Sequence, residues 1–301
     1  MTDYRANRTY KDSLFRMLFS DKHELLSLYN AISGKNYDNP DDIEINTLQD
    51  VIYISVKNDI SFVIRDYQLL YEHQSTNNGN MPLRNLFYIA NIYSKRTVNK
   101  NLYGSSTVKI PNPQFVVFYN GVEEMPERSV QKLSDAFTHN NGPDDIQLEL
   151  SVIVLNVNEG YNKELMEKCK RLREYTYFVA AVRRNLKKHD IETATELAIE
   201  ECITNDILAD FLRRYKAEVK AVSILEYDAA KHLAFERAEG KVEGKAEKEI
   251  SLLRNMYGEL DVEKIAKFLA CEVAYVETLI DLITAYPTET DEELAKRLFV
   301  Q

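Results

Sequence analysis

Asp59, Glu72 and Gln74 are the residues of this chain whose types and spacing best suit metal chemistry. They lie at the ends of two apolar, β-branched and aromatic runs, residues 60–64 and 69–71, which a short polar break separates. Such a pattern predicts a β-hairpin. Because successive side chains of a strand point to opposite faces, Glu72 and Gln74 share one face of the predicted hairpin, and the residue between them points the other way.

The position of the turn decides which residue lies opposite Asp59. A two-residue turn at Arg65-Asp66 places Asp59 opposite Glu72, and a turn one residue later places it opposite Gln74. In either case two carboxylates and a carboxamide converge on one face, and such oxygen ligands are those that Mg²⁺ prefers. The alternative is an exposed hairpin face that is merely polar, since this spacing is a loose pattern.

The acidity of the chain belongs to its second part. The net charge is −10 over 301 residues, yet residues 1–120 carry nearly equal numbers of basic and acidic side chains. The part that holds the candidate site can therefore still form a basic groove, and the side chains available for it are Lys57, Arg65, Arg84, Lys95, Arg96 and Lys100. Charge neither supports nor excludes DNA binding, and any non-specific affinity should be salt-sensitive.

Composition and cysteine usage bound the class of protein. Hydrophobic residues make up 45% and aromatic residues 10% of the sequence, which indicates a folded globular chain. Cys169, Cys202 and Cys271 are widely spaced and form no C-x-x-C pair, so neither a zinc knuckle nor a disulfide framework is expected. The polar start and the lack of a long apolar run predict no signal peptide and no membrane span, and we expect a cytoplasmic protein.

Periodicity predicts an α/β protein that ends in a helical region. Apolar residues at helical spacing from Leu14 onward predict one helix, or two broken near Ser20-Asp21, ending at Gly34. We expect strands over residues 43–48, 51–64, 69–75, 115–119 and 148–157, and a helix over residues 83–102. From residue 161 onward the patterns are helical.

Short motifs occur along the chain at residues 11–19, Asp59, 72–74, 84–88, 113–121 and 156–166. Together and in this order they resemble the Rpn family of recombination-promoting nucleases, which are also described as transposases. This family belongs to the PD-(D/E)XK nuclease superfamily. The resemblance covers residues 4–250, and it rests on the combination and order of the motifs, because each motif alone is a weak signal.

The resemblance implies a restriction-endonuclease-like mixed sheet flanked by helices, with the hairpin at one edge of the sheet. On this basis we expect a nuclease core over residues 1–158, followed by a helical extension over 159–235. A charged, glycine-containing tract over 236–249 is expected to form a solvated helix or a linker. Residues 250–301 are expected to form a small helical C-terminal segment.

The resemblance also implies a role for each residue of the hairpin. Asp59 matches the metal-binding aspartate of the family, and Glu72 matches the glutamate of its E-x-K motif. Gln74 stands where most of the superfamily has lysine, although the family itself commonly has glutamine there. Glutamine can only hydrogen-bond, whereas lysine also supplies charge. The main-chain carbonyl of His73 is implied as a further metal ligand, while its side chain should face away from the metal.

The activity that the resemblance implies is Mg²⁺-dependent endonucleolytic hydrolysis of phosphodiester bonds in DNA, with a link to recombination or mobile elements. Mn²⁺ is expected to substitute for Mg²⁺. The cation held by Asp59 and Glu72 would polarise the phosphate and activate a water molecule, and Gln74 would position that water.

Three residues outside the hairpin are candidates for accessory roles. Arg84 shares a helix face with Tyr88, and it either contacts the scissile phosphate or forms an ion pair that holds the helix to the sheet. Glu24 either adds a third carboxylate or is a solvated surface residue. Lys11 matches the family at the start of the first helix.

Two other classes of function stay open at this point. A catalytically inactive DNA- or protein-interaction module would keep the nuclease fold without the metal, and the acidity of the second part of the chain favours it. An assembly partner would instead form homo-oligomers through the C-terminal helices in residues 250–301. A helix-turn-helix is the alternative for that segment, but its few basic residues favour a packing or partner module.

Overall fold

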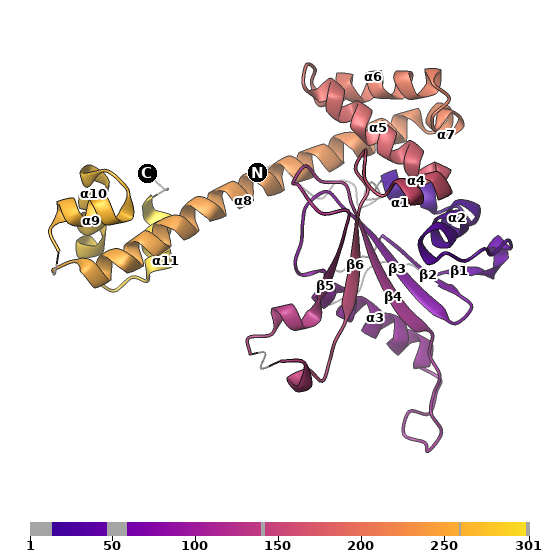
Figure 1. Cartoon of the computed structure of the whole chain (residues 1–301), viewed down its shortest axis with the longest axis horizontal. Helices are drawn as coiled ribbons and strands as arrows, with labels where there is room; N and C mark the ends of the chain where they lie inside the picture. The colour runs from indigo at the N-terminus through magenta and orange to yellow at the C-terminus, as the bar shows by residue number, and fades with distance from the viewer. Residues whose placement is uncertain (1–13, 47–58, 140–141, 259, 299–301) are drawn as a thin grey trace, which may run out of the picture. The chain divides into compact units, whose positions relative to one another are not determined.

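The computed structural model of the protein describes residues 14–46, 59–139, 142–258 and 260–298. The chain divides into two compact units, Met1–Tyr227 and Asp228–Gln301. The first unit contains a mixed sheet flanked by helices, and the second is helical (Figure 1). The predicted α/β fold class with a helical C-terminal region is therefore confirmed.

The sheet has six strands in the order β1-β2-β3-β4-β6-β5. Their bounds are β1 Ile43–Ile45, β2 Ile60–Ile64, β3 Tyr67–Gln74, β4 Asn112–Tyr119, β5 Arg128–Lys132 and β6 Ser151–Asn156. The central strands β3, β4 and β6 run parallel, whereas β1, β2 and β5 join antiparallel to their neighbours. The predicted position of the hairpin at a sheet edge is wrong, because β1 pairs with the outer side of β2.

The hairpin adopts the first of the two predicted registers. Ile60 pairs with Tyr71 and Ile64 pairs with Tyr67, so the turn consists of Arg65 and Asp66. Arg65 has a φ of 52°, which is the left-handed conformation that tight hairpin turns require. In this register Asp59, which precedes Ile60, lies opposite Glu72, which follows Tyr71.

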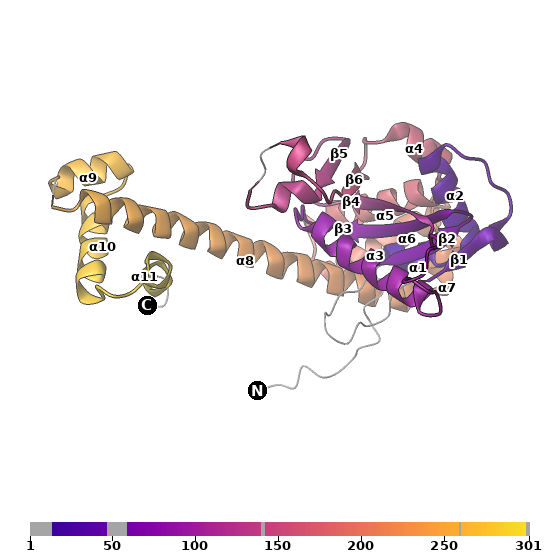
Figure 2. The same cartoon turned by 90° about the horizontal axis from the view of Figure 1, so that it is seen from below.

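Helices cover both faces of the sheet. Figures 1 and 2 show α3 on one side of the strands and α5 and α6 on the other. The helices of the first unit are α1 Leu14–Phe19, α2 Lys22–Ser33, α3 Met81–Thr97, α4 Lys163–Lys168, α5 Lys170–Leu186, α6 Ile191–Thr204 and α7 Ala209–Arg214. Three short 3₁₀ helices lie at η1 Pro40–Asp42, η2 Leu133–Ala136 and η3 Pro143–Asp145.

Strand alternation divides the core of the first unit into two clusters. Leu70 and Val117 pack with Tyr88 of α3. Tyr71 and Phe118, which are the next residues of the same two strands, pack with α1, α2, α4 and α5 on the opposite face. Burial of these aromatic and aliphatic side chains is the main force that holds the helices to the sheet.

The ends of the first helices follow from their capping residues. The side chain of Asp21 accepts hydrogen bonds from the main-chain N–H groups of His23 and Glu24, so α2 starts as a separate helix after α1. Gly34 closes α2 with a φ of 68°. Of the two alternatives that the sequence allows, the chain adopts two helices. The next helix, α3, carries Pro82 in its first turn, where a proline is well tolerated.

The helices α4 to α7 and the start of α8 belong to the first unit. Buried residues of α4, α5, α6, α7 and the start of α8 belong to the same cluster as Tyr71 and Phe118. The charged tract over residues 236–249 lies within α8, which runs from Lys216 to Met256. Of the two alternatives for this tract, helix and linker, the structure has the helix.

The second unit has its own apolar core. It contains the end of α8 together with α9 Val262–Leu269, α10 Val273–Ala285 and α11 Asp291–Leu298. Ile250, Leu253, Ile265, Leu279 and Leu294 are fully buried there. Across the part of the chain that the structure describes, no helix is both long and apolar enough to cross a membrane.

Candidate metal centre

Asp59 and Glu72 meet where β2 begins and β3 nears its end. The main-chain N–H of Asp59 donates to Oε1 of Glu72 over 3.2 Å. Oδ2 of Asp59 in turn accepts from the main-chain N–H of His73 over 2.7 Å. Both bonds run from a main-chain N–H to a side-chain oxygen just beyond the last ladder pair, Ile60 and Tyr71, and they hold the two carboxyl groups near each other.

Glu72 is one of the few buried acidic residues among those described, with a relative exposure of 3%. Burial raises the pKa of its carboxyl group well above the usual range, and the neighbouring charge of Asp59 raises it further. The guanidinium of Arg84 acts in the opposite direction, with Nη2 at 3.5 Å from Oε2 of Glu72. The carboxyl groups of Asp59 and Glu72 therefore share one nearby positive charge, the guanidinium of Arg84, and Glu72 binds a proton more readily than an exposed glutamate does.

Arg84 reaches Glu72 from α3, where it also contacts its own helix. Nη2 of Arg84 donates to the hydroxyl of Tyr88 over 2.8 Å, which confirms that these two residues share a helix face. Nη1 of Arg84 lies 3.3 Å from Sδ of Met81. The ion pair that the sequence offered as one role of Arg84 is thus present. Its side chain remains 36% exposed, so a phosphate contact stays open as a prediction.

Gln74 lies on the same face as Glu72 but turns toward α3. Its Nε2 donates to Sδ of Met81 over 2.6 Å. The side chain is only partly buried. The role of Gln74 as a residue that orients water stays a prediction.

The His73 side chain lies on the opposite face of the sheet, as strand alternation predicts. Its ring stacks on Phe15 with centroids 5.5 Å apart, and its Nε2 is 2.6 Å from the hydroxyl of Tyr175. Burial lowers the pKa of His73 to about 4, and the positive charge of Arg183 contributes to the shift. The imidazole is therefore neutral at physiological pH and acts as a packing residue.

Glu24 does not join Asp59 and Glu72. Its Oε1 accepts from Nη2 of Arg171 over 2.6 Å. Glu24 belongs to α2, whose buried residues pack with Tyr71, whereas Glu72 points to the face that α3 covers. The accessory role predicted for Glu24 therefore has no geometric support. Lys11 lies outside the described residues.

Two neighbouring carboxyl groups are donors of the kind that a hard cation such as Mg²⁺ accepts. In the described parts of the chain no group of three or more His, Cys, Asp or Glu side chains is placed to hold a metal. Mg²⁺ needs only one or two protein carboxylates and keeps several waters, and Asp59 and Glu72 satisfy that requirement. Burial raises the pKa of the Glu72 carboxyl group, so a cation would compete with a proton for this ligand.

A stability measurement tests this electrostatic account. A raised pKa in the folded state means that Glu72 favours folding when protonated, and that this contribution is lost as the pH rises through the folded-state pKa. In EDTA, Glu72→Gln should therefore unfold at a higher temperature than the parent at neutral pH, by a few degrees, or on the order of 1 kcal/mol. The difference should shrink as the pH falls to about 4.

The matched control is Glu44→Gln, which removes an exposed carboxylate from β1. This variant should melt like the parent at every pH. Identical pH profiles for the parent and Glu72→Gln would mean that Arg84 fully offsets the charge of Glu72.

Sequence reasoning missed the parts of this site that come from packing. The signal for Met81 was weak, because a methionine at a helix start carries no chemical pattern. A second cluster, Asn120, Asn158 and Arg183, was not predicted, although polar residues directly after two buried strands are a usable signal.

No protein-family model, no curated protein and no solved structure matches the chain. The resemblance to the Rpn family therefore stays a hypothesis from residue patterns.

Proposed function

We propose that the chain is a Mg²⁺-dependent DNA endonuclease that hydrolyses phosphodiester bonds, and that Asp59, Glu72 and Gln74 form its centre. The observation that supports this proposal best is the side-by-side arrangement of the two carboxyl groups at the end of the hairpin. The order of motifs that resembles the Rpn family agrees with it, and a link to recombination or mobile elements is part of the same proposal.

In this proposal Asp59 and Glu72 hold the cation. When bound, the cation supplies Lewis acidity and lowers the pKa of a coordinated water. Glu72 must give up its proton to bind, so affinity should increase with pH. The peptide N–H of His73 keeps Asp59 oriented through its bond to Oδ2. Mn²⁺ should bind the same oxygen ligands.

Arg84 would supply the positive charge that a lysine supplies in most of the superfamily. Gln74 carries no charge, and it can only orient a water molecule or a phosphate oxygen by hydrogen bonds. Arg84 is partly exposed beside Glu72, so its guanidinium can turn outward toward a phosphate once a cation neutralises Glu72. The ion pair in the metal-free site and the phosphate contact would then be two states of one residue.

A catalytically inactive interaction module is the second candidate, and one observation favours it. Arg84 already pairs with Glu72, and Gln74 is already bonded to Met81, so the site is internally satisfied without a cation. Such a module would bind DNA or a protein partner and leave the phosphodiester bond intact.

The experiment that separates the two candidates is plasmid nicking. Supercoiled plasmid is incubated with the protein in Mg²⁺, in Mn²⁺ and in EDTA, and the nicked fraction is measured over time. Nicking that requires the cation supports the nuclease. A salt-sensitive gel shift without nicking supports the interaction module. The nuclease proposal fails if there is no nicking and calorimetry detects no binding of either cation.

A further inference from the structure

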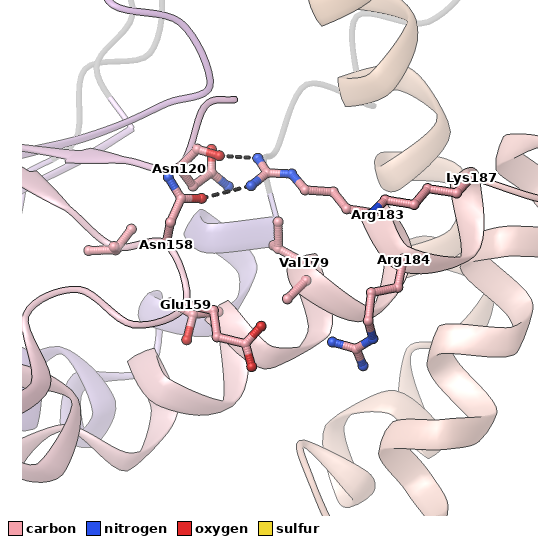
Figure 3. Close-up of a pocket in the computed structure, with 10 residues that line it drawn as sticks. Asn120, Asn158, Glu159, Val179, Arg183, Arg184 and Lys187 are labelled. Carbon is pink, nitrogen blue, oxygen red and sulfur yellow. Dashed lines mark hydrogen bonds between the residues drawn. The ribbon is translucent and has the colours of Figure 1, made fainter. Parts of the chain in front are cut away.

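A second polar cluster lies at the carboxyl ends of β4 and β6, where α5 packs against the sheet. Asn120 directly follows β4, and Asn158 follows β6 by two residues. Arg183, in the last turn of α5, extends to both of them (Figure 3). Its Nη1 donates to Oδ1 of Asn158 over 2.7 Å, and its Nη2 donates to the main-chain oxygen of Asn120.

These residues line a cavity of about 230 Å³. The polar and charged residues that line it are Asn120, Asn158, Glu159, Thr176, Arg183, Arg184 and Lys187. Drug-sized ligands and nucleosides usually occupy sites of about 300–1,000 Å³, so this cavity suits a smaller group. The carboxyl ends of parallel strands are the usual place for ligands in open α/β sheets, and β4 and β6 are parallel neighbours.

Arg183 is a largely buried cation whose bonds go to uncharged oxygens. Among the described residues, no carboxylate lies within ion-pair distance of its guanidinium. Burial lowers its pKa, which indicates that the surroundings compensate its charge only in part. A guanidinium has five N–H donors, and the contacts to Asn120 and Asn158 use two of them. Nη1 and Nη2 each carry a second N–H group that these two contacts do not use.

The other charged residues of the cavity leave it with positive character. Arg184 is neutralised by Glu201 over 2.7 Å, whereas Lys187 has no ion pair within the part of the chain that the structure describes. Glu159 is exposed, so water screens its charge at the rim. Arg183 and Lys187 are separated by four positions and share one face of the end of α5. The side chains of Arg183 and Lys187 thus both contribute positive charge to the cavity.

We propose that this cavity is a phosphate-binding site, in which Arg183 and Lys187 bind the anionic oxygens. Planar guanidinium groups suit phosphate in a bidentate manner, and Lys187 adds a mobile point charge at the entrance. The phosphate comes either from free inorganic phosphate or a small phosphomonoester, or from a nucleic-acid backbone. The cavity uses none of the side chains of the metal centre, and its helix α5 packs on the face of the sheet opposite Glu72. The two sites are neighbours, since the main-chain N–H of Asn120 donates to the main-chain oxygen of Gln74 over 3.0 Å.

The test measures binding of inorganic phosphate and of a short DNA duplex to the full chain and its variants. Lys187→Ala is the main variant, because this side chain is exposed and forms no hydrogen bond among the described residues. Its matched control is Lys188→Ala, an exposed neighbour outside the cavity. Arg183→Gln is measured alongside, with a thermal melt to show whether it folds. Calorimetry is performed at constant ionic strength, with chloride as the competing anion.

The parent and Lys188→Ala should bind phosphate alike, and Lys187→Ala should bind it roughly tenfold more weakly, as expected when one charge-assisted hydrogen bond is lost. A folded Arg183→Gln should lose at least as much. If inorganic phosphate does not bind but duplex affinity falls in Lys187→Ala and not in Lys188→Ala, the ligand is the nucleic-acid backbone. Equal behaviour of both lysine variants toward both ligands, or no binding of either, overturns the proposal.

Discussion

Asp59→Asn should lower Mg²⁺-dependent nicking of supercoiled plasmid at least about a hundredfold while leaving the fold intact. Residues that only support a metal ligand already change activity about 10- to 100-fold when mutated, so loss of a direct ligand should have at least that effect. The asparagine keeps an oxygen for the N–H of His73, which Asp59 accepts over 2.7 Å. The variant therefore removes one negative charge and little else.

Asp66→Asn is the matched control for this prediction. Asp66 is an exposed residue of the turn in the same hairpin, and the change is chemically identical. The measurement is the initial rate of conversion of supercoiled to nicked plasmid, with a melting curve for each variant. Equal rates for Asp59→Asn and the parent would show that the cation lies elsewhere. A loss of activity in both variants would indicate a general effect of charge.

The local geometry of the centre could be predicted because it depends on short-range rules. Alternation along β3 puts Glu72 and Gln74 on one face and His73 on the other, and the apolar runs on both sides of the turn predict the two strands. The position of the turn could not be chosen in advance, because both placements bury the same apolar residues. The strand pairing of Ile64 with Tyr67 decides it.

Contacts between distant elements were beyond sequence reasoning. Glu24 was a reasonable candidate for a third carboxylate, but its partner Arg171 is 147 positions away and belongs to a helix on the far face of the sheet. The sequence predicts that α3 has a buried face, whereas the side chain it presents to Glu72 depends on how helix and sheet pack. For the same reason Arg84 had two open roles until its distance to Glu72 was known.

Two strands show why the sheet itself was only partly predictable. The edge strand β5, Arg128–Lys132, has charged and polar residues at most positions, which is typical of edge strands. A search for alternating hydrophobic residues therefore does not detect it. β1 was expected, but not its place outside β2, because the order of strands in a sheet depends on long-range pairing. Its presence makes the hairpin an internal part of the sheet, with β1 paired to the end of β2 that lies next to the turn.

Phe118→Ala should lower the free energy of unfolding of the first unit by about 3–5 kcal/mol, the range found when a buried phenylalanine is truncated. Phe118 is fully buried in β4, the strand between β3 and β6. Its ring centroid lies 4.9 Å from that of Phe15 and 5.3 Å from that of Tyr71. The cavity would thus open between the sheet and α1, where few side chains can move to fill it.

This loss is large because domains are stable by only about 5–15 kcal/mol in total. Urea unfolding followed by circular dichroism measures it, and Phe87→Ala is the control, since Phe87 is 45% exposed on α3 and should change stability by less than about 0.5 kcal/mol. Phe118→Leu should give an intermediate loss, because the cavity is smaller. If Phe118→Ala lowers the free energy of unfolding as little as Phe87→Ala does, the ring cluster does not hold α1 to the sheet. A large loss would instead show that the strand next to Glu72 and His73 depends on this packing, so that the same variant should also weaken cation binding.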